Sequence, residues 1–490
     1  MASKLNISKI EISNLFDMFS YDIELNDDLT ILTSPNGYGK STILRMINNF
    51  TTGNYYSFLH ESFNKVVFHL VENEGRSERK HKQLELLNHF MGTKDIKDQD
   101  EIINLFGFNF EDETTRHKIE VIKNNRVVTI SDLTKDDSPT TIVELPPESE
   151  FSVIVSSIEA KNPITRIEYD SWTDDFTGEI YDFKGLVARY NSTLNEEVRG
   201  RIFKNTAWLD SIIKNVNSYF ISTDRIKSNV VRNRRHSRNE KSASMIKNLA
   251  MIISDKIQEG IRNQFDIGRE KETTFPERLI KLLKSDDKFV TQHELLSLIN
   301  DIQKYESKFS KLGLISDTNS RTTNLLNDFF DYENSSTGNV VLKIYLDDIK
   351  SKFKALDTLS NQLRLFTETL NKLLSFKEIK VNLKKGFTVQ PSNGKKDIDI
   401  SELSSGEQHI IIMIGKLIFE SKKGDLILID EPEISLHPEW QEAYIDSLEE
   451  IRKEREFRIL MATHSTMIIG HRWDEVIELS ATSNEVNPHE

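Results

Sequence analysis

Two groups of motif residues at opposite ends of the chain constrain its fold more than any other feature. Near the N-terminus, an apolar run at 28–33 leads into a glycine-containing loop and then into a helical pattern that reaches Asn49. Near the C-terminus, a polar segment at 403–408 precedes two short apolar runs that end in polar residues, at 426–431 and 458–464. Strands that end in such loops are typical of α/β proteins, whose sites lie at strand ends. We therefore expect the two groups to form the halves of one site.

The N-terminal loop has the composition of a phosphate-binding loop. Backbone N–H groups of residues 36–42 can point at phosphate oxygens, because the helix N-terminus is positive and the glycines let the backbone approach closely. The Lys40 ammonium would pair with the β- and γ-phosphates of ATP, and the Ser41 hydroxyl would bind Mg²⁺. Serine at position 34 replaces the first glycine of the usual pattern. The expected ATP contacts here are Asn36, Gly37, Gly39, Lys40, Ser41 and Thr42.

The segment 403–408 is predicted to supply a second group of phosphate contacts. Strands are expected just before it, at 387–390 and 397–400. Either of two serines can then cap a helix that starts near Glu407, which leaves free N–H groups at its N-terminus as an anion site. The expected ATP contacts here are Ser404, Ser405, Gly406 and Glu407.

The two apolar runs that follow are predicted to end in catalytic and metal-binding residues. Asp430 is placed to hold Mg²⁺ through water, so that Ser41 and Asp430 are the expected metal residues. Glu431 is placed to orient and polarise the attacking water, and His464 to hydrogen-bond the γ-phosphate, which makes these two the expected catalytic residues. No single motif is decisive, but their order and spacing indicate an ATP-hydrolysing site.

These motifs resemble those of ABC-type ATPases in the branch that includes the SMC, RecF and OLD-like proteins. The resemblance covers about residues 1–70 and 380–480. It implies an α/β fold, the ABC ATPase head, which has a mixed sheet around a phosphate-loop core and an inserted helical or coiled-coil arm. It also implies that the 403–408 signature of one head closes on the ATP and Mg²⁺ of another, in a homo-oligomer built from head-to-head dimers. The segment 435–441 resembles the loop that contacts the partner head.

The middle of the chain is predicted to complete the head and to add helices. A β pattern is expected at 64–71, 116–122, 126–130 and 151–156. A helical pattern at 191–216 precedes an expected strand at 219–223. Leu342 to Leu374 keeps a heptad-like spacing, enough for an antiparallel coiled-coil arm of roughly 50 Å, with a compact helical bundle as the alternative. The predicted domains are 1–240, the N-terminal part of the head; 241–376, the helical insertion; and 377–490, the C-terminal part of the head.

The segment 225–241 is strongly basic and is a candidate contact for an acidic partner. It is either a solvated loop or a site for nucleic acid or an acidic protein. No Phe, Tyr or Trp lies within it, so base stacking is poorly supported, and direct DNA binding stays open. The candidate partner-binding residues are Arg232, Arg234, Arg235 and Arg238.

Composition narrows the remaining classes. The chain has 490 residues, no cysteine and a net charge of −14, which argues against a thiolate metal site and against sequence-blind DNA binding by the whole surface. It has no apolar run long enough to span a membrane and no signal-peptide pattern, so we expect a cytoplasmic protein without a membrane partner. No nuclease-like carboxylate cluster follows His464, so any nuclease effector is expected on a separate chain.

An ATPase of this kind resembles the ATPase subunits of anti-phage defence systems. The AriA type of PARIS pairs with a Toprim nuclease, AriB, and the PtuA type of Septu pairs with an HNH nuclease. The AriA resemblance implies an assembly that sequesters its effector and releases it on sensing an acidic, DNA-mimicking phage anti-restriction protein. Two alternatives stay open: a DNA-repair ATPase of the RecF type, and a transport ATPase coupled to a membrane permease.

Overall fold

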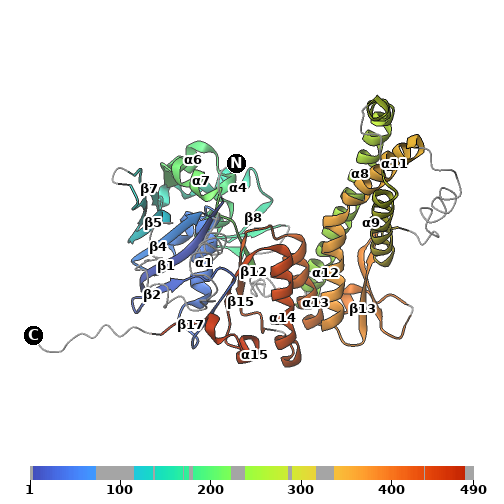
Figure 1. The fold of residues 1–490 in the computed structure, drawn as a ribbon. Helices are drawn as coiled ribbons and strands as arrows, with labels where there is room; N and C mark the ends of the chain where they lie inside the picture. The colour runs from blue at the N-terminus through green and yellow to red at the C-terminus, as the bar shows by residue number, and fades with distance from the viewer. Residues whose placement is uncertain are drawn as a thin grey trace, which may run out of the picture. The chain divides into compact units, whose positions relative to one another are not determined.

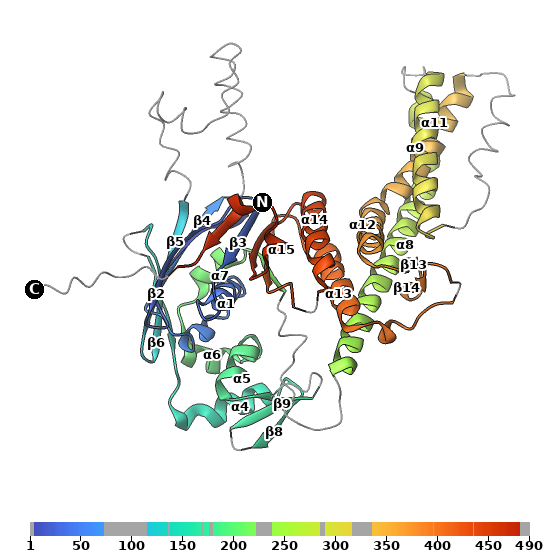
Figure 2. The same ribbon diagram turned by 90° about the horizontal axis from the view of Figure 1, so that it is seen from below.

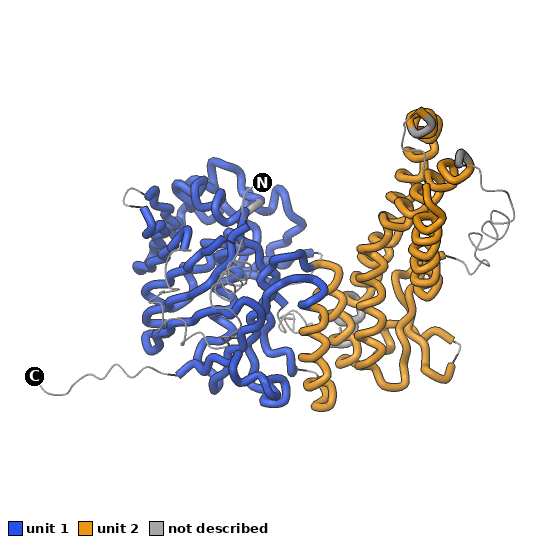
Figure 3. The backbone as a smooth tube through the Cα atoms, in the orientation of Figure 1, with its two compact units in different colours: residues 1–235, 421–434, 452–490 blue, residues 236–420, 435–451 orange. Residues whose placement is uncertain are grey.

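The computed structural model divides the chain into two compact units, which Figure 3 shows in different colours. Unit 1 contains residues 1–235, 421–434 and 452–490, and unit 2 contains 236–420 and 435–451. The described residues are 4–72, 115–135, 138–168, 170–175, 180–221, 238–284, 290–315, 336–394, 396–434 and 436–480.

A five-stranded parallel sheet carries the motif loops of unit 1. Its strand order is β12-β15-β16-β3-β17. Parallel strands are buried on both faces, which explains why the three motif-bearing strands read as continuous apolar runs. Because β3, β15 and β16 are neighbours that run in the same direction, the loops after them meet at one edge of the sheet. The strands are β3 (Leu29–Thr33), β12 (Ser218–Ile221), β15 (Leu426–Asp430), β16 (Arg458–Ala462) and β17 (Val476–Glu478).

Helix α1, Lys40–Thr51, follows the glycine-containing loop after β3 and lies between two sheets (Figures 1 and 2). It packs against β12, β15 and β16 of the parallel sheet. Its other side meets the second sheet, where the rings of Phe50 and Phe68 stack with centroids 4.0 Å apart. Both aromatic side chains are fully buried, so the C-terminal end of α1 is held by a large apolar core.

The second sheet of unit 1 has seven antiparallel strands in the order β11-β7-β6-β5-β4-β1-β2. The predicted strands at 64–71, 116–122 and 126–130 are confirmed as members of this sheet. Its strands are β1 (Leu5–Leu15), β2 (Phe19–Glu24), β4 (Lys65–Glu72), β5 (Thr115–Asn124), β6 (Val127–Asp132), β7 (Thr141–Glu144) and β11 (Phe203–Lys204). Unit 1 also holds a small sheet of β8 (Ile164–Glu168), β9 (Ser171–Asp174) and β10 (Ile180–Tyr181), and helix α5 (Phe183–Tyr190).

Two sequence predictions are wrong, and a third is confirmed only in part. The segment 151–156 is the start of helix α4, Phe151–Glu159, because its buried side chains, Ile154, Val155 and Ile158, follow helical rather than alternating spacing. The predicted strand 397–400 makes a single bridge, Val389 to Ile398, before the short 3₁₀ helix η5, Ile400–Glu402. The predicted helical segment 191–216 is two short helices, α6 (Glu196–Ile202) and α7 (Ala207–Ile213), separated by β11.

Unit 2 is mainly helical. Helix α11 packs against both α8 and α9, and a small apolar cluster that includes Ile299, Ile302 and Leu346 lies between α9 and α11. Arg278 of α8 donates two hydrogen bonds of 2.7 Å to Asp348 of α11, a bidentate geometry that fixes the two helices in register. The elements are α8 (Arg238–Lys284), α9 (Gln292–Lys311), α11 (Ser336–Lys354), α12 (Asp357–Leu373), α13 (Ser405–Phe419), most of α14 (Pro438–Arg455), β13 (Lys377–Asn382) and β14 (Gly386–Pro391).

The predicted continuous arm over Leu342–Leu374 is two helices, α11 and α12, that separate at Ala355 and Leu356. The two helices serve different neighbours: α11 packs against α8 and α9, whereas α12 packs against α13 and β13. A break lets each half bury its apolar side chains against its own neighbours, although alanine and leucine favour helix. The predicted fold class, an α/β ATPase head with an inserted helical part, is confirmed.

Candidate nucleotide-binding site

Two residues of the loop between β3 and α1 have backbone conformations that favour glycine. Gly37 has φ 91° and Gly39 has φ 88°, both in the left-handed region. A Cβ on Gly39 would also lie 2.6 Å from Cδ2 of Leu15, whereas at Gly37 the surrounding space is open. Helix α1 begins without a side-chain cap. An anion in the loop can therefore take the place of that cap.

Lys40 is almost fully buried, and its ammonium group points back into the loop. It donates to the carbonyl oxygen of Ser34 at 2.9 Å and lies 2.7 Å from Nε2 of His464. Since an ammonium group can only donate, Nε2 of His464 accepts, and the imidazole proton is on Nδ1. Burial lowers the pKa of Lys40, and the nearby carboxylates of Glu431 and Asp430 partly oppose this effect.

Ser41 and Asp430 form the second contact between the two ends of the chain. The Ser41 hydroxyl donates to Oδ1 of Asp430 at 2.8 Å, and Asp430 is buried at the end of β15. One hydroxyl and one carboxylate fit Mg²⁺, which prefers oxygen ligands and completes its shell with water and phosphates. No group of three or more His, Asp or Glu side chains within the described ranges is arranged to hold a metal. The donor set therefore suits an ion that is bound together with a nucleotide.

Glu431 has a strained backbone at the end of β15. Its φ is 43°, which is uncommon for a residue other than glycine. Its N–H donates to the carbonyl oxygen of Ala462 on the neighbouring strand at 2.8 Å, which holds the backbone in place. Residues held in such conformations cluster at active sites, where the surrounding structure fixes them.

Glu433 belongs to the same site, although it is not one of the predicted site residues. One carboxylate oxygen accepts from the backbone N–H of His464 at 2.7 Å, and the other accepts from the Thr463 hydroxyl at 2.9 Å. The only sequence signal was a further acidic residue just after Asp430, Glu431 and Pro432. Its partners become visible only when the loops after β15 and β16 are seen side by side.

The predicted signature residues lie in unit 2, at the N-terminus of α13. Ser404 is the N-cap and, with Glu407, forms a reciprocal capping box, so the helix begins at Ser405. Oε1 of Glu407 also accepts from Nζ of Lys377 on β13 at 2.6 Å. Burial alone would raise the pKa of Glu407, but the hydrogen bonds from Lys377 and Ser404 hold it below its ordinary value. Gly406 follows in the first turn of the helix.

The remaining predicted residues are placed as follows. Asn36 is exposed in the loop, and Thr42 is buried in the first turn of α1, where its hydroxyl accepts from Arg45 at 2.9 Å. Arg238 is the first residue of α8. Arg232, Arg234 and Arg235 lie outside the described residues, and so does Ser435 of the predicted partner-contact loop.

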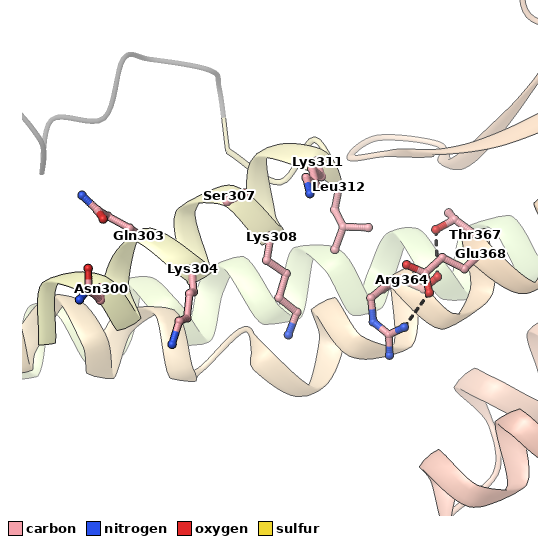
Figure 4. Close-up of a pocket in the computed structure, with 10 residues that line it drawn as sticks. All are labelled: Asn300, Gln303, Lys304, Ser307, Lys308, Lys311, Leu312, Arg364, Thr367 and Glu368. Carbon is pink, nitrogen blue, oxygen red and sulfur yellow. Dashed lines mark hydrogen bonds and ion pairs between the residues drawn. The ribbon is translucent and has the colours of Figure 1, made fainter. Parts of the chain in front are cut away.

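A cavity of about 800 Å³ lies elsewhere in unit 2, between α9 and α12 (Figure 4). It contains none of the motif residues. Lys308 on its wall donates to Asp357 at 2.6 Å and to Asn361 at 2.7 Å, and Arg364 pairs with Glu368 at 2.6 Å. These two cations are therefore already neutralised by side chains of the protein itself.

Comparisons with known proteins agree with the ATPase assignment. A sequence profile described as the AAA ATPase domain matches residues 6–469. The chain belongs to this AAA ATPase domain family. It is also similar to the energy-coupling factor transporter ATP-binding protein EcfA2 of Spiroplasma kunkelii, with 30% identity over 128 residues, 24% of this chain and 40% of EcfA2. Zinc import ATP-binding protein ZnuC of Rickettsia bellii is 24% identical over 199 residues, 39% of this chain and 82% of ZnuC.

Similarity to solved structures is weak. The head domain of Smc from Pyrococcus furiosus, bound to the C-terminal domain of ScpA, gives a TM-score of 0.32 and 13% identity, over 97% of this chain and 94% of that one. The SmcHead bound to the C-winged helix domain of ScpA gives 0.33 and 10%, over 96% and 93%. None of the helices in the described ranges could cross a membrane.

Proposed function

We propose that this chain binds and hydrolyses ATP at the edge of the parallel sheet where the loops after β3, β15 and β16 meet. The observation that supports this most strongly is a pair of contacts between the two ends of the chain: Lys40 with His464 at 2.7 Å, and Ser41 with Asp430 at 2.8 Å. They place a phosphate-binding lysine, two oxygen ligands and a histidine around one glycine-containing loop. Asn36, Gly37, Gly39 and Thr42 complete the proposed loop contacts.

Each residue has a separate proposed role. Lys40 binds the β- and γ-phosphates, which requires its ammonium group to turn from His464 towards them. Glu431 accepts a proton from the attacking water and orients it. His464 donates to the γ-phosphate through Nε2, which requires the ring proton to be on Nε2 once Lys40 has turned away. Ser41 and Asp430 would hold Mg²⁺, which when bound would supply positive charge to the phosphate oxygens.

We further propose that the site is completed by a second copy of the chain. The N-terminus of α13, with Ser404, Ser405, Gly406 and Glu407, is a capped helix end whose positive dipole suits a γ-phosphate. Residues 1–240 and 377–490 would then form the head, and the insertion 241–376 would transmit its closure to a partner.

The biological role that we favour is a sensor subunit of an anti-phage defence complex of the AriA type. In this proposal the ATP-dependent homo-oligomer controls a separate Toprim nuclease, or an HNH nuclease as in Septu. An acidic, DNA-mimicking phage protein would be the trigger, and the basic residues Arg232, Arg234, Arg235 and Arg238 would bind it. The support is the composition of that segment and the motif resemblance.

Two other roles are compatible with the same ATP site. A RecF-like repair ATPase would bind DNA, and a transport ATPase would bind a permease; transport is favoured by the names of the curated relatives EcfA2 and ZnuC. Co-purification from the native host followed by mass spectrometry separates the three roles. A bound nuclease supports defence, a bound membrane permease supports transport, and DNA without a protein partner supports repair. Charge reversal at Arg232, Arg234 and Arg235 should abolish trigger binding, and retained binding would refute that contact.

A further inference from the structure

We infer that Glu433 is a positioning residue for His464: its carboxylate fixes the loop after β16 so that the imidazole faces the phosphate-binding lysine. The inference rests on the proposed function, because it assigns a role in ATP hydrolysis at the same site. Glu433 follows Asp430 and Glu431 in the acidic loop after β15. Its side chain crosses to the neighbouring histidine loop rather than entering the phosphate loop.

Both carboxylate oxygens of Glu433 have a partner in the histidine loop. The backbone N–H of His464 donates to one at 2.7 Å, a short, charge-assisted bond that fixes the main chain at the histidine itself. The Thr463 hydroxyl donates to the other at 2.9 Å and accepts from the Ser465 N–H at 3.0 Å. The Glu433 carboxylate therefore holds Thr463 and His464 directly, and it holds Ser465 through the Thr463 hydroxyl.

This carboxylate also determines where the His464 ring can lie. The ring nitrogen Nε2 is 2.7 Å from Nζ of Lys40, so a small rotation of the loop would remove the ring from the phosphate-binding end of α1. Thr463 is fully buried, and without Glu433 its hydroxyl and the His464 N–H would both lose their acceptor. The negative charge of Glu433 also opposes the lowering of the Lys40 pKa by burial, after the larger effects of Glu431 and Asp430.

Glutamate is the residue type that this arrangement requires. Two donors at different positions need two acceptor oxygens, and a glutamine offers one oxygen and an amide that can only donate. Glu433→Gln therefore keeps the size and shape of the side chain and removes one acceptor. Glu433→Ala removes both. The loss of function should increase from the first variant to the second.

A double-mutant cycle between Glu433 and His464 tests the inference directly. The proteins are the wild type, Glu433→Gln, His464→Ala and the double variant, with single-turnover ATP hydrolysis and ATP affinity measured for each. Glu433→Gln should slow hydrolysis about ten- to a hundredfold and change ATP affinity little, because a displaced positioning contact acts on the reacting geometry. In the His464→Ala background the same substitution should have no further effect. Glu24→Gln, an exposed carboxylate at the end of β2, is the control and should hydrolyse ATP like the wild type.

The outcomes separate this inference from the proposed function. If His464→Ala slows hydrolysis and Glu433→Gln does not, Glu433 has no positioning role and the site assignment stands. If Glu433→Gln slows hydrolysis equally with and without His464, Glu433 acts directly on the reaction and the inference is wrong. If His464→Ala hydrolyses ATP normally, the proposed role of the histidine fails. Thermal unfolding of each variant verifies folding, and Glu433→Gln provides the test even if Glu433→Ala does not fold.

Discussion

The ammonium nitrogen of Lys40 lies 2.7 Å from Nε2 of His464, although the two residues are at opposite ends of the chain. The strand order β15-β16-β3 explains the contact, because the loop after β16 is adjacent to the loop after β3. Lys40 is thereby oriented by the residue that is proposed to meet the same phosphate. The contact links the phosphate loop to the loops that are proposed to carry the chemistry.

Replacing Lys40 by alanine is expected to abolish detectable ATP binding. The ammonium group is the proposed cation for two phosphates, and each charged hydrogen bond contributes about 1.5–3 kcal/mol. Fluorescent-nucleotide titration measures the loss. Lys123→Ala is a matched control, since Lys123 is also a partly buried lysine with a pKa lowered by burial, but it lies on β5. ATP affinity near the wild-type value in Lys40→Ala would contradict the assignment.

Replacing Glu431 by glutamine is expected to leave ATP binding intact and to slow hydrolysis by about 10²- to 10⁴-fold, because the amide cannot accept the proton of the attacking water. Single-turnover hydrolysis and a separate binding assay distinguish the two steps. Glu456→Gln is the control, since Glu456 also has a positive φ, 54°, in the same unit but is exposed and pairs with Lys423. Normal turnover in Glu431→Gln would refute the role of Glu431 as the base.

Replacing Asp430 by asparagine is expected to raise the Mg²⁺ concentration needed for half-maximal hydrolysis about ten- to a hundredfold, the usual effect of losing a carboxylate that holds a metal through water. Ser41→Ala should change the same quantity in the same direction, because its hydroxyl is the second proposed ligand. The measurement is ATP hydrolysis across a Mg²⁺ titration. Asp27→Asn, at an exposed carboxylate, is the control. An unchanged Mg²⁺ requirement in both Asp430→Asn and Ser41→Ala would exclude this pair as the metal site.

His409 on α13 is expected to make the protein less stable in acid. It is buried, neither ring nitrogen has a hydrogen-bond partner among the described residues, and burial lowers its pKa to about 4. The unfolded chain, with a histidine pKa near 6.5, takes up a proton between pH 6.5 and 4 that the folded chain does not. Stability should therefore be complete above pH 6.5 and fall by roughly 3 kcal/mol as the pH drops to 4.

The comparison of wild type with His409→Leu isolates this effect from that of other acidic transitions. Denaturant unfolding between pH 8 and 4.5 should show a shallower loss of stability in the variant. Identical pH dependence in the two proteins would mean that His409 takes up its proton without unfolding.

Much of the site could be predicted because its signals are local. Apolar runs mark β3, β15 and β16, glycines mark the loop before Lys40, and the Ser-x-x-Glu spacing marks the cap of α13. Glu433 and Lys377 could not be found in this way, since each acts on a residue that only the folded chain brings near. The β-branched run at 151–156 suggested a strand, whereas its burial is helical, because the packing of α4 outweighs local propensity.

The most direct test of the central claim, that one ATP site uses two copies of the chain, is hydrolysis by a mixture of two inactive variants. The Lys40→Ala variant has a defective phosphate loop and an intact α13 N-terminus. The Ser405→Arg variant has an intact phosphate loop and a defective α13 N-terminus. If the site forms between two copies, the mixture should recover about a quarter of the wild-type rate, because half of randomly mixed dimers contain one intact composite site out of two. A mixture as inactive as its two components, after exchange of subunits has been verified, would contradict the account.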